Sequence, residues 1–349
     1  MIPDRPHRPA ALQLAVRMQK QITGERLQPG ARYLGAEAAA RHFRVRKAVA
    51  NQALQILAQR GLLIRKPRLG AIIAEPTTTP PHLGRIVLLT QADHPDTEGQ
   101  QDGAVVSGLQ TEFPGADVHL QTLSGQDAAT HVEQLIGEAL KSKVSNGLIL
   151  IRGSAEIQRR VAEGGLPAVV YGSVWPGVTL SSLNVDNAVI ADMLTRALVQ
   201  QGARRLLLLR RDRATPGENA LLQGTLDAAR SIGVPLDVLE LPAASELIQI
   251  ALQSRLSRPD SRCAVLAATP ALARGACRLL PERSVACGSI HPVLGRSRVL
   301  RCLPDTDFRD QGKLLGRLLL QRLQYPEAAA EHQTLTCHLK PATYESPIQ

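Results

Sequence analysis

The sequence predicts two kinds of domain. The first is an α+β domain of three helices and a β-hairpin, and the second is an α/β domain of two lobes built from repeated strand–helix units. Three observations support this prediction: the excess positive charge is confined to the start of the chain, a segment rich in Pro and Thr follows it, and strand-like and helix-like segments then alternate. At 349 residues, the chain is long enough for two or three domains that each bury a core.

Apolar residues at helical spacing predict three helices in the first part of the chain. The first ends at Gly24, the second covers 36–43, and the third begins near Arg46 and ends at Gly61. The stretches LLIRK and AIIAE alternate weakly around PRLG, which indicates a two-stranded hairpin. Three helices followed by a hairpin form a winged helix-turn-helix, with the third helix as the recognition helix and the hairpin as the wing.

The charge of this first part points to a polyanion. Residues 1–75 hold 14 Lys and Arg against four Asp and Glu, and their net charge of +10 equals that of the whole chain. The third helix begins among Arg44, Arg46 and Lys47, although the helix macrodipole disfavours cations at that end. A solvated basic face would explain the charge alone. Charge and predicted topology together favour a DNA-binding module attached to a neutral body.

The predicted recognition helix offers specific contacts to DNA. Lys47 and Asn51 are four residues apart and share one face of the helix. Asn can pair with adenine and Lys can contact guanine, each contact discriminating by roughly 1–3 kcal/mol. Arg68, at the tip of the wing, is expected to reach a phosphate or an adjacent groove.

The stretch GERLQPGARYLGAEAAARHFRVRKAVANQALQILAQRGLLIRKPRLGAII resembles the DNA-binding domain of the GntR family of transcription factors. In that family, G-x-L-x-P-G-x-R-L-P-S-E-R-E-L-A leads into V-S-R-x-T-V-R-x-A-L-x-x-L-x-x-x-G-L and a G-R-G-T wing. The alignment needs no gap from Gly24 to Ile73. The matching framework residues are Leu27, Pro29, Gly30, Arg32, Ala40, Val45, Ala53, Leu54, Leu57, Gly61, Leu62, Arg65 and Gly70.

The positions that face DNA in the family match less well. Where the family has Ser, Arg, Arg, Arg and the first wing Gly, this chain has Gly35, Glu37, Lys47, Asn51 and Arg68. A retained framework with changed contacts implies either an altered sequence specificity or weaker binding that nearby cations partly compensate. The resemblance thus implies DNA binding through Arg44, Arg46, Lys47, Asn51, Arg68 and Gly70.

A short segment separates this module from the rest of the chain. The stretch EPTTTPPHLG, from Glu75 to Gly84, has three Pro and three Thr in ten residues, which favours an extended, semi-rigid linker. We therefore predict a DNA-binding domain over 1–75, a linker over 76–84 and a ligand-binding and dimerisation domain over 85–349.

The remainder of the chain repeats one structural unit. Strand-like segments such as GRIVLLT, NGLILIR and PAVVYGSV alternate with helix-like segments such as VEQLIGEALK and EIQRRVAE. A second series of similar size includes ALLQGTLDAARSIGV, PLDVLEL, CAVLAAT, SVACGSI and RVLRCL. Repeated β-α units imply parallel sheets covered by helices on both faces. Two series of similar size predict two lobes with a ligand cleft between them.

From about Gly84 to Pro341 the sequence resembles the effector-binding domain of the LacI family, which is related to periplasmic sugar-binding proteins. LPAVVYGSVWPGVTLSSLNVDNAVIADMLTRALVQQGARRLLLLRR is similar to the family's P-V-V-x-x-D, its V-x-x-D-N that opens a helix, and its L-x-x-x-G-H-R-R-I-A-L-I. VLAATPALARGACRLL and LPDTDFRDQGKLLGRLLLQRL resemble two later motifs. The resemblance implies a periplasmic-binding-protein-like (LacI-type) fold of two α/β lobes that bind a small effector such as a carbohydrate.

The departures from the LacI pattern fall in the expected cleft. The family's Asn-Asp pair is Thr269-Pro270 here, and its ligand-holding Arg corresponds to Leu221 or Asn219. These changes remove groups that would form charge-assisted hydrogen bonds to sugar hydroxyls. The remaining candidates for ligand binding are Tyr171, Trp175, Asn184, Asp212, Arg213 and Ser289.

Several of these candidates have a second interpretation. Trp175 suits a platform on which a sugar ring stacks, but it equally suits a loop aromatic packed against the connection between the lobes. Asp212 and Arg213 equally suit a solvated loop pair. Asp186 and Asn187 are more typical of a helix cap than of ligand contacts.

The sequence contains none of the motifs of the common enzyme classes that we considered. GxxxxGK[ST], GxGxxG, HExxH and GxSxG are all absent. The five Cys lie between 263 and 337 with no CxxC, which favours small core residues in a reducing cytoplasm over disulfides or a metal site. No apolar run is long enough to span a bilayer, and the N-terminus lacks a secretory h-region. We expect no cofactor.

The sequence thus predicts a cytoplasmic transcriptional regulator, a repressor by family resemblance, whose affinity for an operator depends on a small ligand. A homodimer would bind a palindromic operator in double-stranded DNA. Two alternatives remain: a ligand-independent DNA-binding regulator with a degenerate cleft, and an α/β enzyme with a basic appendage. The enzyme would require titratable groups that converge at strand ends, which the sequence does not show.

Overall fold

The computed structural model describes residues 10–25, 27–59, 61–66, 70–74, 83–91, 102–123, 127–142, 144–241, 250, 252–253, 262–279, 284–290 and 299–340. These residues divide into two compact units. The first unit contains the described residues of 10–91, 102–182 and 308–332, and the second contains those of 183–307 and 333–340. The predicted linker at 76–84 lies almost wholly outside the described residues.

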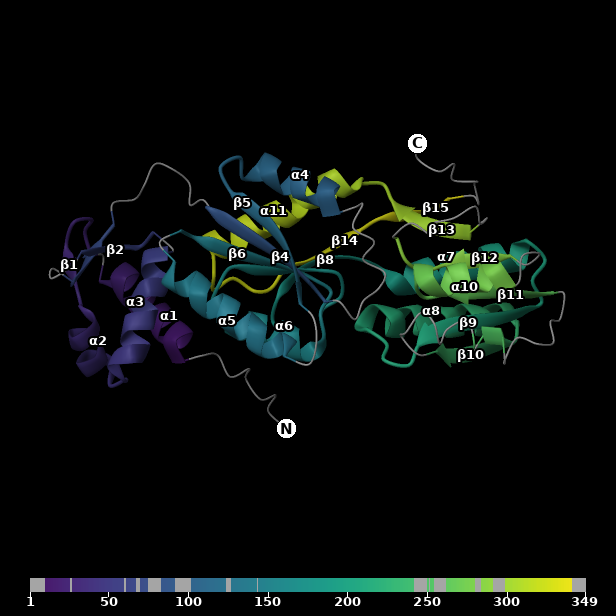
Figure 1. Ribbon diagram of the computed structural model, residues 1–349, viewed down its shortest axis with the longest axis horizontal. Coiled ribbons are helices and arrows are strands. Elements are labelled where there is room, and N and C mark those ends of the chain that lie inside the picture. Colours follow the sequence, from purple (N-terminus) through teal and green to yellow (C-terminus); the bar gives the residue numbers. More distant parts are fainter. Residues whose placement is uncertain are drawn as a thin grey trace. The chain divides into compact units, whose positions relative to one another are not determined.

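The first part of unit 1 contains the three predicted helices and the predicted hairpin (Figure 1). Strand β3 lies between β1 and β2 and runs antiparallel to both. Side chains of α1 and α3, including Leu14, Met18 and Leu57, are fully or almost fully buried and form the core. The elements are α1 (Ala10–Gly24), β1 (Arg32–Tyr33), α2 (Ala36–Phe43), α3 (Lys47–Gln59), β2 (Leu63–Lys66) and β3 (Gly70–Ile73).

The rest of unit 1 carries most of a six-stranded sheet, in the order β14-β8-β7-β6-β4-β5, of which β8 and β14 continue into unit 2. The pairs β5–β4, β4–β6 and β6–β7 are parallel, as repeated β-α units require. Every residue of β6 is buried, which explains its continuous apolar sequence. The elements are β4 (Arg85–Gln91), α4 (Asp102–Glu112), β5 (Asp117–Leu123), α5 (Ala128–Lys141), β6 (Asn146–Ile151), α6 (Ala155–Glu163), β7 (Ala168–Tyr171), β8 (Ser181–Val185), α11 (Phe308–Gln324) and β14 (His332–Leu335).

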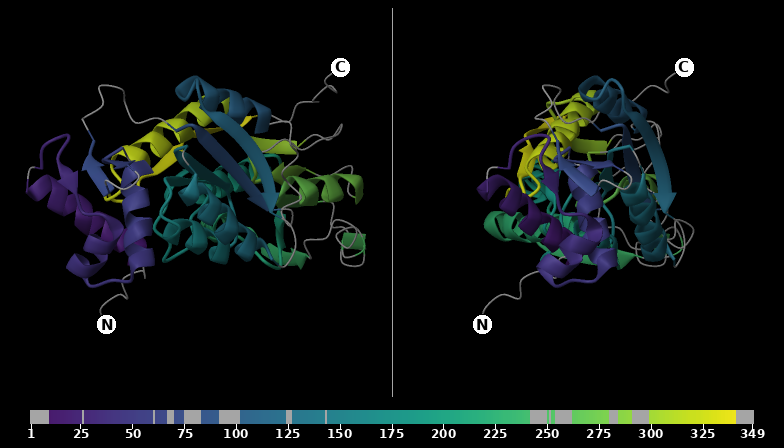
Figure 2. Two further views of the ribbon diagram at one scale, coloured as in Figure 1. Left: turned by 60° about the vertical axis from the view of Figure 1, so that its left-hand side comes forward. Right: turned by 90° about the vertical axis from the view of Figure 1, so that its left-hand side faces the viewer.

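Helices α4 and α11 come from distant parts of the sequence but lie side by side in Figure 1 and in both views of Figure 2. Glycine makes this contact possible. A Cβ atom at Gly108 would lie 2.0 Å from the Arg309 carbonyl oxygen, and one at Gly312 would lie 2.3 Å from the Val105 carbonyl oxygen. Helix α11 therefore packs with α4 beside the first sheet, where it also contacts β6 and β7.

Unit 2 carries the second six-stranded sheet, in the order β10-β9-β11-β12-β13-β15. All of its pairs are parallel except β13–β15. Leu209, Val265 and Leu272 belong to the core that α10 shares with this sheet. The elements are α7 (Asn187–Gln200), β9 (Arg205–Arg211), α8 (Pro216–Ile232), β10 (Leu236–Leu241), β11 (Cys263–Ala267), α10 (Pro270–Leu279), β12 (Val285–Cys287), β13 (Val299–Pro304) and β15 (Cys337–Lys340).

The helix cap expected at Asp186 is confirmed. Its side chain accepts hydrogen bonds from the backbone N–H groups of Ala188 and Val189, both at 3.0 Å, and α7 begins at Asn187. None of the five Cys, all of which the structure describes, forms a disulfide. Among the described residues, no helix is long and apolar enough to cross a membrane.

Candidate nucleic-acid interface and strand-end clusters

Helix α3 has one packed side and one exposed side. The packed side contacts α1 and α2, and its buried residues are Ala50, Ala53, Leu54, Ile56 and Leu57. Lys47, Asn51 and the preceding Arg46 are exposed. Small and aliphatic residues therefore pack one side of the helix, and the polar residues Lys47 and Asn51 lie on its exposed side.

Arg44 lies at the turn between α2 and α3 in the left-handed region, with φ 55° and ψ 47°. This conformation lets the N–H of Val45 donate to the Ala40 carbonyl at 3.0 Å and closes the end of α2. A residue with a Cβ pays roughly 1–2 kcal/mol for this geometry, whereas glycine adopts it freely. An exposed Arg at this turn thus carries a backbone cost, which is typical of functional positions.

The side chain of Arg65, in β2, links the β2–β3 hairpin to α3. Its Nη2 donates to Asn51 Oδ1 at 2.7 Å, and its Nη1 donates to Gln55 Oε1 at 2.9 Å. One turn earlier, the Lys47 ammonium lies 3.6 Å from a carboxylate oxygen of Glu37 in α2. These side chains are largely exposed, so their contacts compete with water and contribute little to the stability of the fold.

The β2–β3 hairpin approaches the start of α2 closely. Gly70 has φ +85°, and a Cβ atom there would lie 3.7 Å from the Cα of Gly35. Gly70 therefore shapes the backbone of the hairpin, because few other residues adopt this φ. Arg68, the predicted wing-tip contact, lies outside the described residues.

Two predicted ligand-binding residues belong to unit 1 and form hydrogen bonds with other residues of the same unit. The buried Tyr171 hydroxyl donates to Oε1 of the buried Gln311 in α11. The indole N–H of Trp175 donates to the Gly153 carbonyl at 3.0 Å, and its backbone N–H donates to Gln158 Oε1 at 2.9 Å. Trp175 is half-buried, and these two bonds orient it within its loop.

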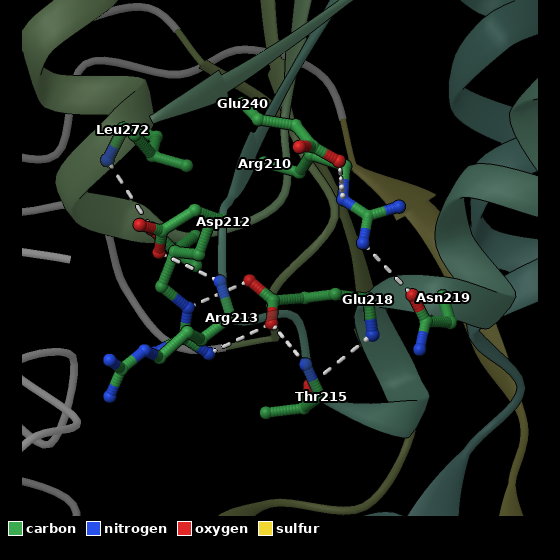
Figure 3. A network of polar contacts seen from close by, with 10 residues as sticks. Arg210, Asp212, Arg213, Thr215, Glu218, Asn219, Glu240 and Leu272 are labelled. Atoms are coloured by element: carbon green, nitrogen blue, oxygen red, sulfur yellow. Dashed lines mark hydrogen bonds and ion pairs between the residues drawn. The ribbon is translucent and has the colours of Figure 1, made fainter. Parts of the chain in front are cut away.

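In unit 2, a buried ion pair lies where β9 ends and α8 begins (Figure 3). Arg211 donates through Nε and Nη2 to the two carboxylate oxygens of Glu218, at 2.8 and 3.0 Å, and their side chains are only 6% and 7% exposed. Glu218 also accepts from the Thr215 N–H at 2.7 Å, while Thr215 Oγ1 accepts from the Glu218 N–H at 3.3 Å. This reciprocal pair is a capping box that starts α8.

A second arginine lies on the neighbouring position of β9. Arg210 donates to Asn219 Oδ1 at 3.0 Å, and its Nε lies 3.7 Å from a carboxylate oxygen of Glu240 (Figure 3). The exposed Asp212 accepts the backbone N–H of its exposed neighbour Arg213 at 2.7 Å. Arg210 and Arg211 are thus bound within the lobe, whereas Arg213 is exposed.

Three strand ends of unit 2 meet at one edge. Because β9, β11 and β12 are parallel neighbours, Asp212, Thr269 and Ser289 follow them at the same edge of the sheet. Thr269 Oγ1 accepts from the Leu272 N–H at 3.4 Å and so caps α10. Leu221, one of the two positions aligned with the ligand-holding Arg, is buried beside Gly288.

Only some of the predicted ligand-binding residues lie at the same edge of a sheet. Asp212, Arg213 and Ser289 share an edge, but Asn184 lies in β8, a strand of the other sheet. The Arg211–Glu218 pair was missed. The T-x-x-E spacing of Thr215 and Glu218, which is typical of a capping box, would have indicated at least the helix start.

No protein-family model and no curated protein sequence matches the chain. Solved structures with the same fold do exist. The transcription regulator CcpA of Lactococcus lactis is 14% identical with a TM-score of 0.60, over 76% of this chain and all of the other. A complex of the transcriptional regulator CelR with cellobiose is 17% identical with a TM-score of 0.60, over 95% of this chain and 98% of the other.

A third structure is described as a periplasmic binding protein/LacI transcriptional regulator from Alkaliphilus metalliredigens QYMF, complexed with D-xylulofuranose. It is 13% identical with a TM-score of 0.57 and covers 75% of this chain. Identities this low establish the fold alone. The two lobes of this chain therefore have the two-domain α/β, periplasmic-binding-protein-like fold of LacI-type regulators.

Proposed function

We propose that this chain is a DNA-binding transcriptional regulator, with residues 10–74 forming a winged helix-turn-helix and the two lobes binding a small effector. The observation that carries the proposal is the polarity of α3. Its apolar side is packed, while Arg46, Lys47 and Asn51 are exposed next to the hairpin. A recognition helix in the major groove needs this division of its surface.

The fold of the lobes supports the regulatory half of the proposal. Structures with this fold include a regulator bound to cellobiose and a LacI-type regulator bound to D-xylulofuranose. By analogy, we propose a carbohydrate or a related polar molecule as the effector, with Tyr171, Trp175, Asn184, Asp212, Arg213 and Ser289 as candidate contacts. A cytoplasmic homodimer on a palindromic operator, acting as a repressor, is the arrangement that we propose.

Binding to DNA can be tested by fluorescence anisotropy with a labelled 30-base-pair random duplex over a series of salt concentrations. Each lost phosphate contact should lower the slope of log K against log salt by about one. The double variant Arg44→Ala/Arg46→Ala should therefore bind more weakly, with a slope about two units shallower. An unchanged slope would contradict a role for this face in DNA binding.

Effector binding can be tested by thermal shift with cellobiose, D-xylulose, sugar acids and nucleosides. A ligand at 100 times its Kd should stabilise the protein by about 2.7 kcal/mol.

One observation favours a second candidate, a regulator that needs no ligand. Arg211 and Glu218 satisfy each other, and a buried Leu221 stands at one of the two positions aligned with the ligand-holding Arg. DNA binding without any thermal shift would favour that candidate.

A further inference from the structure

The exposed face of α3 carries polar side chains whose hydrogen-bond donors and acceptors can be told apart. Lys47, Asn51 and Gln55 are spaced by four residues and lie along one face of the helix. Arg65, from β2, lies beside the two amides and contacts both. What this face can recognise depends on which atoms of these side chains remain available, and the inference below rests on the proposed DNA binding.

The contacts with Arg65 fix the orientation of both amides. A guanidinium has donors and no acceptor, so the atoms 2.7 Å and 2.9 Å from it are the carbonyl oxygens of Asn51 and Gln55. The bonds are charge-assisted and leave each NH2 group as the atom directed away from Arg65. Lys47 also has only donors. The face therefore presents a row of three N–H donor groups.

Base edges differ in how well they match such a row. Guanine offers two adjacent acceptors, N7 and O6, in the major groove, whereas adenine offers N7 beside a donor amine. Bidentate recognition of adenine requires both the oxygen and the nitrogen of an Asn side chain. In this chain the Asn51 oxygen accepts a hydrogen bond from Arg65, so an adenine amine would have to use its second lone pair, next to the cationic guanidinium. The adenine contact expected from the sequence alone is thus disfavoured.

We propose that Arg65 is a specificity-positioning residue, which orients Asn51 and Gln55 so that the recognition helix reads guanine-rich half-sites. Arg65 acts through the two amides rather than by touching a base. The fork of the guanidinium is what allows one side chain to hold two oxygens on successive turns of α3. Lysine would supply the charge without this geometry.

The test is a selection of preferred sites from a random duplex library with the full-length protein. The unmodified protein should select half-sites with consecutive guanines on one strand. Replacing such a guanine by adenine should weaken binding about tenfold or more, as should 7-deazaguanine, which lacks the N7 acceptor. Selection of adenine at these positions would overturn the inference while leaving DNA binding intact.

The variant Arg65→Met provides the second arm, because it frees both amide oxygens. The preference for guanine over adenine opposite Asn51 should then fall about tenfold or reverse, and Arg65→Lys should behave in the same way. Lys66→Met is the matched control, because it removes the same charge from the next residue of β2. It should keep the base preference of the unmodified protein.

Two further outcomes would contradict the proposal. If Arg65→Met weakens all duplexes equally and keeps the guanine preference, Arg65 is a phosphate contact and the inference is wrong. If the unmodified protein selects no site at all, the proposed function fails and the inference fails with it. Circular dichroism of each variant shows whether a change in preference comes from a folded protein.

Discussion

Two arginines of this chain form similar hydrogen bonds in opposite environments. Arg65 donates to Asn51 and Gln55 at the surface of the N-terminal helices, and Arg211 donates to both oxygens of Glu218 in unit 2. The bond lengths all lie between 2.7 and 3.0 Å. The two groups differ in partner and in solvent exposure. Arg65 binds two neutral amides and is exposed, while Arg211 binds a carboxylate and the side chains of that pair are 6% and 7% exposed.

This difference separates a contact that contributes little to folding stability from one that contributes much. A surface hydrogen bond competes with water, so its loss changes the free energy of unfolding little. A buried ion pair has already lost its hydration, so removing one partner leaves an uncompensated charge. The exposed group is thus available for recognition, while the buried pair maintains the lobe.

The largest predicted effect is the loss of the buried arginine. Arg211→Met leaves the Glu218 carboxylate buried without its partner and should destabilise unit 2 by about 3–5 kcal/mol. Urea unfolding can follow the two units separately, because all five Cys belong to unit 2 and the single Trp, Trp175, belongs to unit 1. The midpoint for thiol labelling should fall further than the midpoint for Trp fluorescence.

The control for this prediction replaces both partners. Arg211→Met/Glu218→Met removes both charges, so it should recover a substantial part of the lost stability. Full recovery is not expected, since Glu218 also accepts the Thr215 N–H at the start of α8. A double variant no more stable than Arg211→Met would show that the charge imbalance is not the cause.

The next effect concerns the exposed face. Lys47→Ala should remove about 1–3 kcal/mol of discrimination at one base pair, because Lys47 is exposed and its contact to Glu37 at 3.6 Å is weak. Asn51→Ala should relax a different position. Arg44→Ala is the control: it should weaken specific and random duplexes equally and lower the salt slope by about one. Competition titrations with single-base variants of a selected site would measure these effects. If all three variants lost the same affinity for both kinds of DNA, the assignment of α3 as recognition helix would be wrong.

A smaller effect, with opposite signs for folding and binding, is expected at the turn before α3. Arg44→Gly removes the strain of a left-handed residue with a Cβ and should stabilise the fold by about 1 kcal/mol. The same change removes a cation, so DNA binding should weaken. A melting curve followed by circular dichroism, together with anisotropy, tests both signs. Unchanged affinity would mean that the strained turn has no role in binding.

The sequence predicted features that depend on local rules. The strand-helix alternation after Gly84 and the cap at Asp186 follow from apolar patterning and from one side chain next to its own helix. Contacts that depend on tertiary register were not predictable. Arg65 meets Asn51 only because β2 folds back along α3, and no spacing rule relates these two positions. The indole of Trp175 similarly finds its acceptor 22 residues earlier, at Gly153.

The smallest predicted effect completes the comparison, because it uses the same substitution as the largest. Arg65→Met should change the free energy of unfolding by no more than about 0.5 kcal/mol, since Asn51 and Gln55 regain water when the guanidinium is removed. Both Arg-to-Met variants lose one charge and the same hydrogen-bonding group, but the sites differ in burial and in the partner, which is a carboxylate at Arg211 and two neutral amides at Arg65. Urea unfolding of both in the same buffer measures that difference directly. A loss of several kcal/mol in Arg65→Met would mean that the Arg65 contacts hold the β2–β3 hairpin against α3. These exposed hydrogen bonds would then stabilise the fold, as the buried Arg211–Glu218 pair does.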